Sequence, residues 1–289
     1  MIPKISVIIP VLNNSKQLRC TLQALSEQTY PSEKMEVIVV DNGSDEPIEP
    51  YTSNFDVILL REVQNKSPYA ARNRGLEIAS GSIIALTDAN KTPDKRWIEE
   101  GVKTLVDNDA DLVGGEIRFD LPDNCTASER FDSLYFNNNR NLVLKKGSSV
   151  TGNLFIKKEL IDSVGIFPGH FRSGMDIWWS QNAIRKGYKL VFSEKAVVWC
   201  RPRKLRELLK KSYRVGKTHP YIFKESGQTN LQVLIIILKT FSPPKFSWIP
   251  EKNLMNESVW FRTKIWFVAW SYKLYLGSGR LTGLKYILK

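Results

Sequence analysis

Short runs of apolar, mostly β-branched residues alternate with helical patterns along the first 120 residues of the chain. The runs at Ile5–Leu12, Glu36–Val40 and Ser82–Leu86 are too short for helices and lack the regular polar alternation of half-exposed strands. Between them, Gln17–Gln28 and Pro68–Ala79 have helical spacing. Apolar strands separated by helices form a parallel sheet covered on both faces. We therefore predict a Rossmann-like α/β fold with a mostly parallel central sheet.

Three polar residues follow directly after three of these strands. Asn13, Asp41 and Asp88 each stand where an apolar run ends. In open parallel sheets, ligands bind in the crevice beyond the carboxyl ends of the strands. The three side chains are therefore expected in one ligand-binding crevice.

The pattern changes near residue 121. A polar, asparagine-rich segment over residues 121–147 predicts a long loop with a helix around Ser128–Phe136. Further strands are predicted at Val57–Leu60, Leu112–Phe119, Val150–Ile156, Tyr188–Phe192 and Ala196–Trp199, and further helices at Pro93–Val106, Lys157–Val164, Asp176–Lys186, residues 201–218, Leu231–Phe241 and Ser258–Leu276. We expect one domain over residues 1–220, with halves 1–120 and 121–220, and a helical extension over residues 221–289.

The positive charge of the chain is confined to its last 89 residues. Residues 201–289 carry 18 Lys and Arg against 4 Asp and Glu, whereas residues 1–200 carry 24 against 26. Such a segment predicts a polyanionic partner, either nucleic acid or anionic lipid. Its aromatic residues stand among Ile, Leu and Val in VWFRTKIWFVAWSYKLYL, which is typical of a helix at the headgroup boundary of an anionic membrane. We expect residues 201–289 to bind an anionic membrane surface and no nucleic acid; the alternative is a packed helix with a solvated basic edge.

Cysteine usage and hydropathy indicate the cellular compartment in which the protein is expected. Three cysteines without a CxxC pair argue against a disulfide framework and against a cysteine zinc site. The apolar N-terminal run lacks a small-residue cleavage site and is interpreted as a strand. No apolar stretch reaches 18 residues. We expect a cytoplasmic protein that is associated peripherally with the inner face of the cell membrane.

Five segments, in this order and spacing, resemble the sequence markers of family 2 glycosyltransferases, which have the GT-A fold. They are SVIIPVLNN, VIVVDNGSDE, YAARNRG, GSIIALTDAN and SGMDIWWSQNAIRKGYKL, and the resemblance spans residues 3–220. It implies transfer of a sugar from a nucleotide-diphosphate donor to an acceptor hydroxyl, here of a glycan or a lipid-linked saccharide.

The resemblance also assigns donor-binding residues. Asp41 matches a carboxylate that accepts a hydrogen bond from the uracil ring, and Arg72 matches a basic residue near the base and phosphates. A uridine donor is therefore implied, although the ring N–H of guanine would suit the same carboxylate. The other donor-side positions are Pro10, Leu12, Asn13, Asn42, Asp88, Ala89 and Asn90.

Asp88-Ala89-Asn90 stands where the family has an Asp-x-Asp motif that holds Mn²⁺ or Mg²⁺ against the diphosphate. Hard cations prefer oxygen ligands, and one or two carboxylates with substrate phosphates commonly complete the shell. Asp88 and Asn90 are thus the implied metal ligands. Because Asn90 is neutral, the expected affinity for the metal is low.

Asp176 matches the acid of the family on the acceptor side, where it is usually preceded by Glu and is here preceded by Met175. Its implied role is general base: it takes the proton of the acceptor hydroxyl while that oxygen attacks from the face opposite the diphosphate, with inversion. A carboxylate at a helix start is also suited to capping. Gly152, Met175 and Trp178 are the implied acceptor-side positions.

Two other functions fit some of the same residues. Asn90 and Met175 stand in place of acidic residues, which is compatible with a non-catalytic relative that binds a nucleotide sugar or a partner enzyme. The alternating strands and helices alone would permit a dinucleotide-dependent oxidoreductase, but no GxGxxG follows the first strand. The prediction is an inverting, metal-dependent hexosyltransferase of polysaccharide biosynthesis.

Overall fold

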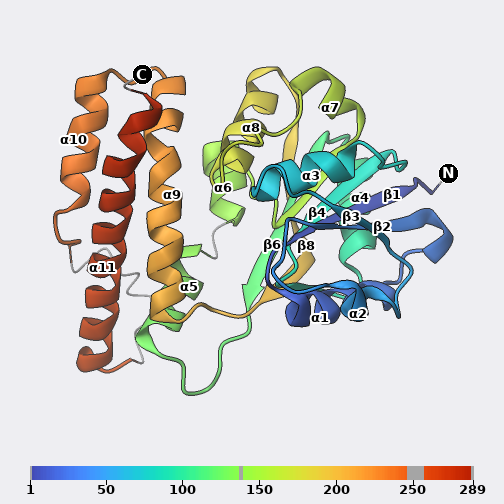
Figure 1. Ribbon diagram of the computed structural model, residues 1–289, viewed down its shortest axis with the longest axis horizontal. Coiled ribbons are helices and arrows are strands. Elements are labelled where there is room, and N and C mark those ends of the chain that lie inside the picture. Colours follow the sequence, from blue (N-terminus) through green and yellow to red (C-terminus); the bar gives the residue numbers. More distant parts are fainter. Residues whose placement is uncertain (1, 137–138, 246–256, 288–289) are drawn as a thin grey trace. The chain divides into compact units, whose positions relative to one another are not determined.

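The computed structural model describes residues 2–136, 139–245 and 257–287 and divides into two compact units (Figure 1). The first, which we call the α/β unit, comprises residues 1–118 and 138–200. The second, which we call the helical unit, comprises residues 119–137 and 201–289.

An eight-stranded mixed sheet forms the centre of the α/β unit, with the order β3-β2-β1-β4-β7-β6-β8-β5. Its strands are β1 (Ile5–Val11), β2 (Met35–Asp41), β3 (Ile58–Arg61), β4 (Ile83–Thr87), β5 (Lys91–Pro93), β6 (Leu112–Phe119), β7 (Asn153–Lys157) and β8 (Leu190–Cys200). β1 pairs in parallel with β2 and β4, and β2 pairs in parallel with β3. β7 runs antiparallel to β4 and β6, and β5 antiparallel to β8. The predicted α/β fold is confirmed, and its parallel part is the sheet half built from the first four strands of the chain.

Helices lie on both sides of this sheet (Figure 1). Every residue of β1 is buried, as expected for a strand covered on both faces. Gly75 of α3 brings its helix close to the sheet, because a Cβ at this position would stand 2.6 Å from Ile8 Cγ2. The helices of the unit are α1 (Ser15–Ser26), η1 (Ser32–Lys34), α2 (Glu49–Thr52), α3 (Pro68–Leu76), α4 (Trp97–Asp107), α6 (Asn139–Lys146), α7 (Glu159–Val164) and α8 (Met175–Arg185).

Three sequence-based assignments differ from the structure. The predicted helix Pro93–Val106 begins only at Trp97, because Pro93 belongs to β5 at the sheet edge, where a missing N–H is tolerated. Residues 139–146, predicted as loop, form α6, whose first residue Asn139 donates from its buried amide to Gly115 O at 2.7 Å. The two predicted strands between residues 188 and 199 are one continuous strand, β8.

The helical unit consists of α5 (Ala127–Phe136), α9 (Leu205–Glu225), α10 (Asn230–Thr240), α11 (Val259–Gly283) and η4 (Leu284–Tyr286). The long helices α9, α10 and α11 lie side by side (Figure 1). Glycines let α9 and α11 approach closely: a Cβ at Gly279 would stand 2.2 Å from Tyr213 O, and one at Gly216 would stand 2.3 Å from Leu276 O. Small residues at a helix contact let the two backbones approach closely.

The helical unit begins at Arg201 and takes in α5, whereas the sequence predicted a boundary at residue 220. Packing explains the difference, since Phe131 of α5 and Leu208 of α9 share one apolar cluster with Tyr272 of α11. Arg203 is also paired with the fully buried Asp132 of α5. Within the described part of the chain, no helix combines the length and the hydropathy needed to cross a membrane.

Candidate active site

Arg72 and Asp88 form an ion pair at the carboxyl end of the parallel strands. Arg72 lies on α3, Asp88 follows β4, and Arg72 Nη2 lies 2.5 Å from Asp88 Oδ1. The arginine side chain is 3% exposed, whereas that of Asp88 is 38% exposed. Arg72 Nη1 donates to Pro68 O at 3.3 Å, and the buried Nε has no partner among the described residues. The pair therefore places a buried positive charge with spare donor capacity beside an accessible carboxylate.

Tyr69 connects this pair to Asp176. It stands three residues before Arg72 on one face of α3, and Arg72 Cζ lies 5.7 Å from the centre of its ring. The phenol donates to Asp176 Oδ1 at 3.0 Å and accepts from Met175 N at 3.1 Å. Burial, and then the negative charge of Asp176, raise the pKa of Tyr69 well above its ordinary value, so the phenol remains a donor. Asp88, Arg72, Tyr69 and Asp176 thus form one continuous chain of contacts.

Asp176 lies in the first turn of α8, where the helix dipole stabilises negative charge. Its Oδ1 accepts from Ile177 N at 3.0 Å and its Oδ2 from Thr151 N at 3.3 Å. Gly174 precedes the helix with a φ of +81°, a left-handed conformation that glycine adopts without strain. The carboxylate is half-buried, so it is fixed in position and still accessible to a ligand.

Gly152 brings the loop before β7 against Asp88. A Cβ at this position would stand 3.1 Å from Asp88 Oδ2, and Gly152 O accepts from Thr87 Oγ1 at 3.3 Å. The same loop touches Asp176 through Thr151. The structure therefore gathers five of the predicted positions around one place, namely Arg72, Asp88, Gly152, Met175 and Asp176.

Asp41 belongs to a second cluster, at the end of β2. Its Oδ1 accepts from Ser44 N at 2.9 Å, and its Oδ2 lies 3.4 Å from Arg61 Nε. Asp41 is only 7% exposed, whereas the Arg61 side chain is 67% exposed. The adjacent Asn42 donates from its amide to Glu62 O at 3.0 Å and so anchors the loop. The Asp41 carboxylate is thus engaged within the protein, by the backbone of Ser44 and by the exposed side chain of Arg61.

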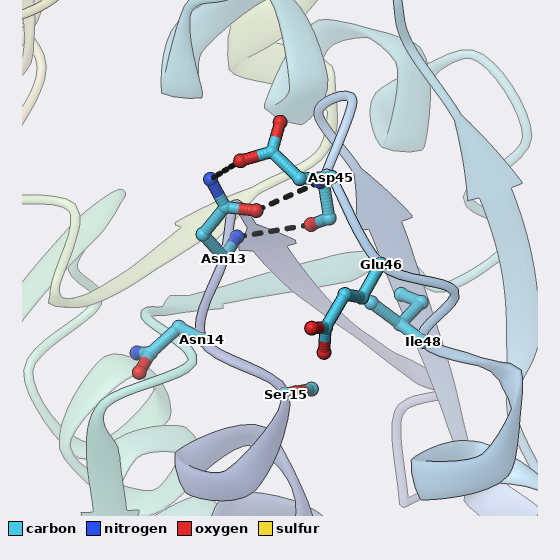
Figure 2. A pocket seen from close by; sticks show the side chains of 7 residues that line it. Asn13, Asn14, Ser15, Asp45, Glu46 and Ile48 are labelled. Atoms are coloured by element: carbon cyan, nitrogen blue, oxygen red, sulfur yellow. Dashed lines mark hydrogen bonds between the residues drawn. The ribbon is translucent and has the colours of Figure 1, made fainter.

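A pocket of about 330 Å³ opens between the loops that follow β1 and β2 (Figure 2). Asn13, with a φ of +52°, donates to Asp45 Oδ2 and accepts from Asp45 N, both at 2.8 Å. Figure 2 shows the carboxylate of Glu46 pointing toward the loop of Asn14 and Ser15. A cavity of this size is within the range of sites for small organic groups. Its lining consists of Asn13, Asn14, Ser15, Ser44, Asp45, Glu46 and Ile48.

The remaining predicted positions have mainly structural surroundings. Pro10 is buried in β1 beside Val40, and Ala89 is buried with its carbonyl accepting from Thr21 Oγ1 at 3.1 Å. Leu12 and Trp178 are half-buried, and Asn90 is exposed. Neither Pro10 nor Ala89 presents a side-chain donor or acceptor, so any contact they make with a ligand is apolar or through the backbone.

Tyr69 is the functional candidate that sequence reasoning missed. Its one sequence signal is its position three residues before Arg72 in a helix, which places both on one face. A tyrosine among alanines in that helix is otherwise indistinguishable from a core residue. Only the fold shows that its hydroxyl reaches a carboxylate 107 residues further along the chain.

The donor set for a divalent cation is small. Within the described residues, no group of three His, Cys, Asp or Glu side chains is arranged to hold a metal. Asp88 Oδ2 accepts no hydrogen bond from those residues, and the exposed Asn90 adds an amide oxygen nearby in sequence. One carboxylate together with substrate phosphates is a shell that Mg²⁺ commonly accepts. These residues therefore fit a cation that binds together with a diphosphate, rather than one held by the protein alone.

Sequence comparisons place the chain among glycosyltransferases. The profile described as glycosyl transferase family 2 matches residues 6–165. The glycosyltransferase AglE of Haloferax volcanii is 35% identical over 302 residues, which cover 100% of this chain and 97% of that protein. The pre-mycofactocin glycosyltransferase of Mycobacterium tuberculosis is 27% identical over 237 residues, covering 78% of this chain and 49% of that protein.

Solved structures share the fold at lower identity. The mannosyltransferase PcManGT from Pyrobaculum calidifontis, solved in complex with GDP-Man and Mn²⁺, superimposes with a TM-score of 0.66 at 18% identity over 98% of this chain and 88% of that chain. Residues 1–349 of TarS from S. aureus superimpose with a TM-score of 0.55 at 18% identity, over 96% of this chain and 91% of that chain.

Proposed function

The chain belongs to glycosyl transferase family 2, and from this membership and the geometry of the site we propose that it catalyses an inverting transfer of a hexosyl group. The donor is a nucleotide-diphosphate sugar, and the acceptor is a hydroxyl of a glycan or of a lipid-linked saccharide. The observation that carries the proposal is the chain of contacts from Asp88 through Arg72 and Tyr69 to Asp176. It supports the proposal because one connected site then holds a cationic group suited to a leaving diphosphate and a carboxylate suited to an incoming hydroxyl.

In this proposal Asp176 acts as the general base. It accepts the proton of the acceptor hydroxyl while that oxygen attacks the anomeric carbon, and the bond to the donor diphosphate breaks on the opposite face, so the configuration inverts in one displacement. Tyr69 and the amides of Thr151 and Ile177 hold the carboxylate in place through hydrogen bonds. Positioned acids and bases of this kind contribute roughly 10²–10⁴-fold to rate.

The diphosphate is proposed to bind beside the Arg72–Asp88 pair. Arg72 carries a permanent charge and retains an unpaired buried Nε, which supports a role in offsetting the charge of the leaving group. Asp88 and Asn90 would hold a Mn²⁺ or Mg²⁺ ion that binds with the donor, and such a cation supplies further charge neutralisation at the diphosphate.

For the nucleoside we propose the pocket between the β1 and β2 loops. Asp41 does not line this pocket, but it accepts a hydrogen bond from Ser44, which does. Asp41 would accept the ring N–H of uracil, after the exposed Arg61 side chain moves away from Oδ2. Guanine presents a ring N–H to the same carboxylate, so the comparison of UDP- and GDP-sugars below identifies the nucleobase of the donor. The polar lining and the volume of the pocket support a base at this place.

We also propose that the helical unit rests on the surface of an anionic membrane, at its cytoplasmic face. α10 exposes four aliphatic side chains at helical spacing, Leu231, Leu234, Ile235 and Leu238. On α11, Trp260 is 70% exposed and lies under the ammonium of Lys264. Aliphatic and aromatic side chains beside cations are what a headgroup boundary accommodates. Full-length protein that fails to float with anionic vesicles would contradict this part of the proposal.

The test of the transferase activity compares wild type with Asp176→Asn. Purified protein is incubated with a panel of UDP- and GDP-sugars and candidate acceptors, and nucleoside diphosphate release is measured. We expect turnover that falls at least about 10²-fold in Asp176→Asn, while Asp162→Asn, an exposed carboxylate on α7, retains activity. Nucleotide binding without turnover by the wild type would instead support a non-catalytic relative, as Asn90 and Met175 permit.

A further inference from the structure

We propose that Lys91 is a donor-binding residue whose ammonium group pairs with the diphosphate of the nucleotide donor beside Asp88. The inference rests on the proposed function and adds a residue that the family resemblance does not assign. It assigns part of the charge neutralisation at the diphosphate to the protein itself rather than to a metal ion.

The ammonium group of Lys91 has no counter-charge among the described residues. The residue is only 6% exposed. Within the described residues, its ammonium group makes neither a hydrogen bond nor an ion pair, and Asp88, three residues before it, is paired with Arg72 instead. Lys91 Nζ is not among the fully buried side-chain atoms that lack a partner, so the ammonium group at the end of the buried stem is accessible to solvent and to an anionic ligand.

The position of Lys91 is set by its backbone. As the first residue of β5 it pairs with Cys200 of β8, its carbonyl accepts from Thr21 Oγ1 at 2.7 Å, and its N–H donates to Asp88 O at 3.0 Å. These contacts fix the strand on both sides, so the side chain leaves the backbone in one defined direction.

That direction leads to the candidate active site. The point where a Cβ of Gly152 would stand is 3.1 Å from Asp88 Oδ2 and 3.5 Å from Lys91 Cε. The absence of a side chain at Gly152 therefore leaves the space into which both the carboxylate and the lysine stem extend. Lys91 and Asp88 converge there from two ends of one tight turn.

The charges around this space favour an anion. Arg72 and Lys91 contribute two positive charges and Asp88 one negative charge, and the Nε of Arg72 is also without a partner among the described residues. A donor diphosphate supplies two negative charges and several acceptor oxygens, which would satisfy both cations. Lysine acts as a point charge for phosphate and needs no fixed approach angle.

The experiment measures nucleotide affinity by isothermal titration calorimetry, with UDP, GDP, uridine and guanosine as the probes, in Mg²⁺ and in EDTA. The variants are Lys91→Met, Lys91→Arg and, as a matched control, Lys95→Met, which removes the same charge from an exposed side chain four residues on. In EDTA, we expect Lys91→Met to bind UDP or GDP about tenfold or more weakly than the wild type, because one charge-assisted contact is lost. Its affinity for uridine and guanosine should be unchanged. Lys91→Arg should restore most of the affinity, and Lys95→Met should bind as the wild type does.

The melting temperature without nucleotide separates a ligand-binding role from a structural one. The accessible ammonium of Lys91 makes no hydrogen bond or ion pair within the described residues, so Lys91→Met should melt close to the temperature of the wild type. The assignment would be overturned if Lys91→Met melted at a lower temperature and lost affinity for nucleosides and diphosphates equally. It would also be overturned if Lys91→Met and the wild type bound the diphosphates with equal affinity. Failure of the wild type to bind either diphosphate would overturn the proposed function itself, and this assignment with it.

Discussion

The hydroxyl of Tyr69 donates a hydrogen bond to Asp176 Oδ1 over 3.0 Å and joins α3 to α8 across 107 residues of sequence. The same hydroxyl accepts from Met175 N, so one side chain orients both the proposed base and the start of its helix. This contact links the proposed donor half of the site to the proposed acceptor half, and the first prediction depends on it.

Tyr69→Phe should lower turnover by roughly tenfold or more and leave the KM for the donor nearly unchanged. The variant removes one hydrogen bond to a charged group, worth about 1.5–3 kcal/mol, without disturbing the packing of the ring against Phe167. Steady-state kinetics with a varied donor concentration measure both parameters. Tyr51→Phe, a half-buried tyrosine of α2, is the control, and an unaltered turnover in Tyr69→Phe would show that Asp176 needs no support from α3.

Asp88→Ala should abolish any response of nucleotide affinity to Mn²⁺ and should destabilise the α/β unit. The first effect follows from the loss of the one accessible carboxylate of the proposed metal site. The second follows because the variant leaves the Arg72 guanidinium, 3% exposed, without its anionic partner, at a cost of about 1–3 kcal/mol. Nucleotide titrations with and without Mn²⁺ and urea denaturation measure the two effects. Asp107→Ala removes the same charge from an exposed site; a Mn²⁺ response that survives in Asp88→Ala would exclude Asp88 as a ligand.

The helical unit should lose stability as the pH falls below 6.5. Burial and the neighbouring Arg280 charge lower the pKa of His219 from 6.5 to about 3, so the ring stays neutral and its Nδ1 accepts from Arg280 Nη2 at 2.8 Å. Between pH 6.5 and pH 3 the unfolded chain binds a proton that the folded chain refuses, and the free energy of unfolding falls by up to about 1.4 kcal/mol per pH unit.

Denaturation curves between pH 7.5 and pH 4.5 test this dependence. His219→Gln keeps an acceptor for Arg280 but does not titrate, so its stability should fall less steeply with pH than that of the wild type. His170→Gln, which removes the exposed second histidine, is the control and should follow the wild type. Equal slopes in wild type and His219→Gln would contradict the neutral buried histidine.

Gly279→Ala should destabilise the helical unit although alanine favours helices. The added Cβ would stand 2.2 Å from Tyr213 O, so α9 and α11 must move apart. Overpacking of this kind costs about 1–3 kcal/mol, more than the helix propensity gained. Thermal unfolding followed by circular dichroism measures the change, with Ser278→Ala, an exposed neighbour on α11, as the control. A rise in melting temperature would mean that the helices do not approach as closely as described.

The elements of the parallel half follow from local patterns. The apolar runs of β1, β2 and β4 and the capping Ser67-Pro68 of α3 are local signals, and the structure has these elements within a few residues of the predicted bounds. β5 and α6 were missed because their stability comes from distant partners. β5 exists through pairing with β8, and α6 is anchored by Asn139 on Gly115.

The sequence by itself determined the fold class, the family and the positions of Asp41, Arg72, Asp88 and Asp176, because strand periodicity and motif spacing depend on neighbours along the chain. Only the tertiary structure decided how those positions are connected. Tyr69 reaches Asp176, and Lys91 reaches the space beside Gly152, through contacts between segments 61 to 107 residues apart. No local pattern encodes such contacts, since they arise when the sheet brings the ends of separate strands together. The boundary of the helical unit was decided in the same way, by the packing of α5 and α9 on α11.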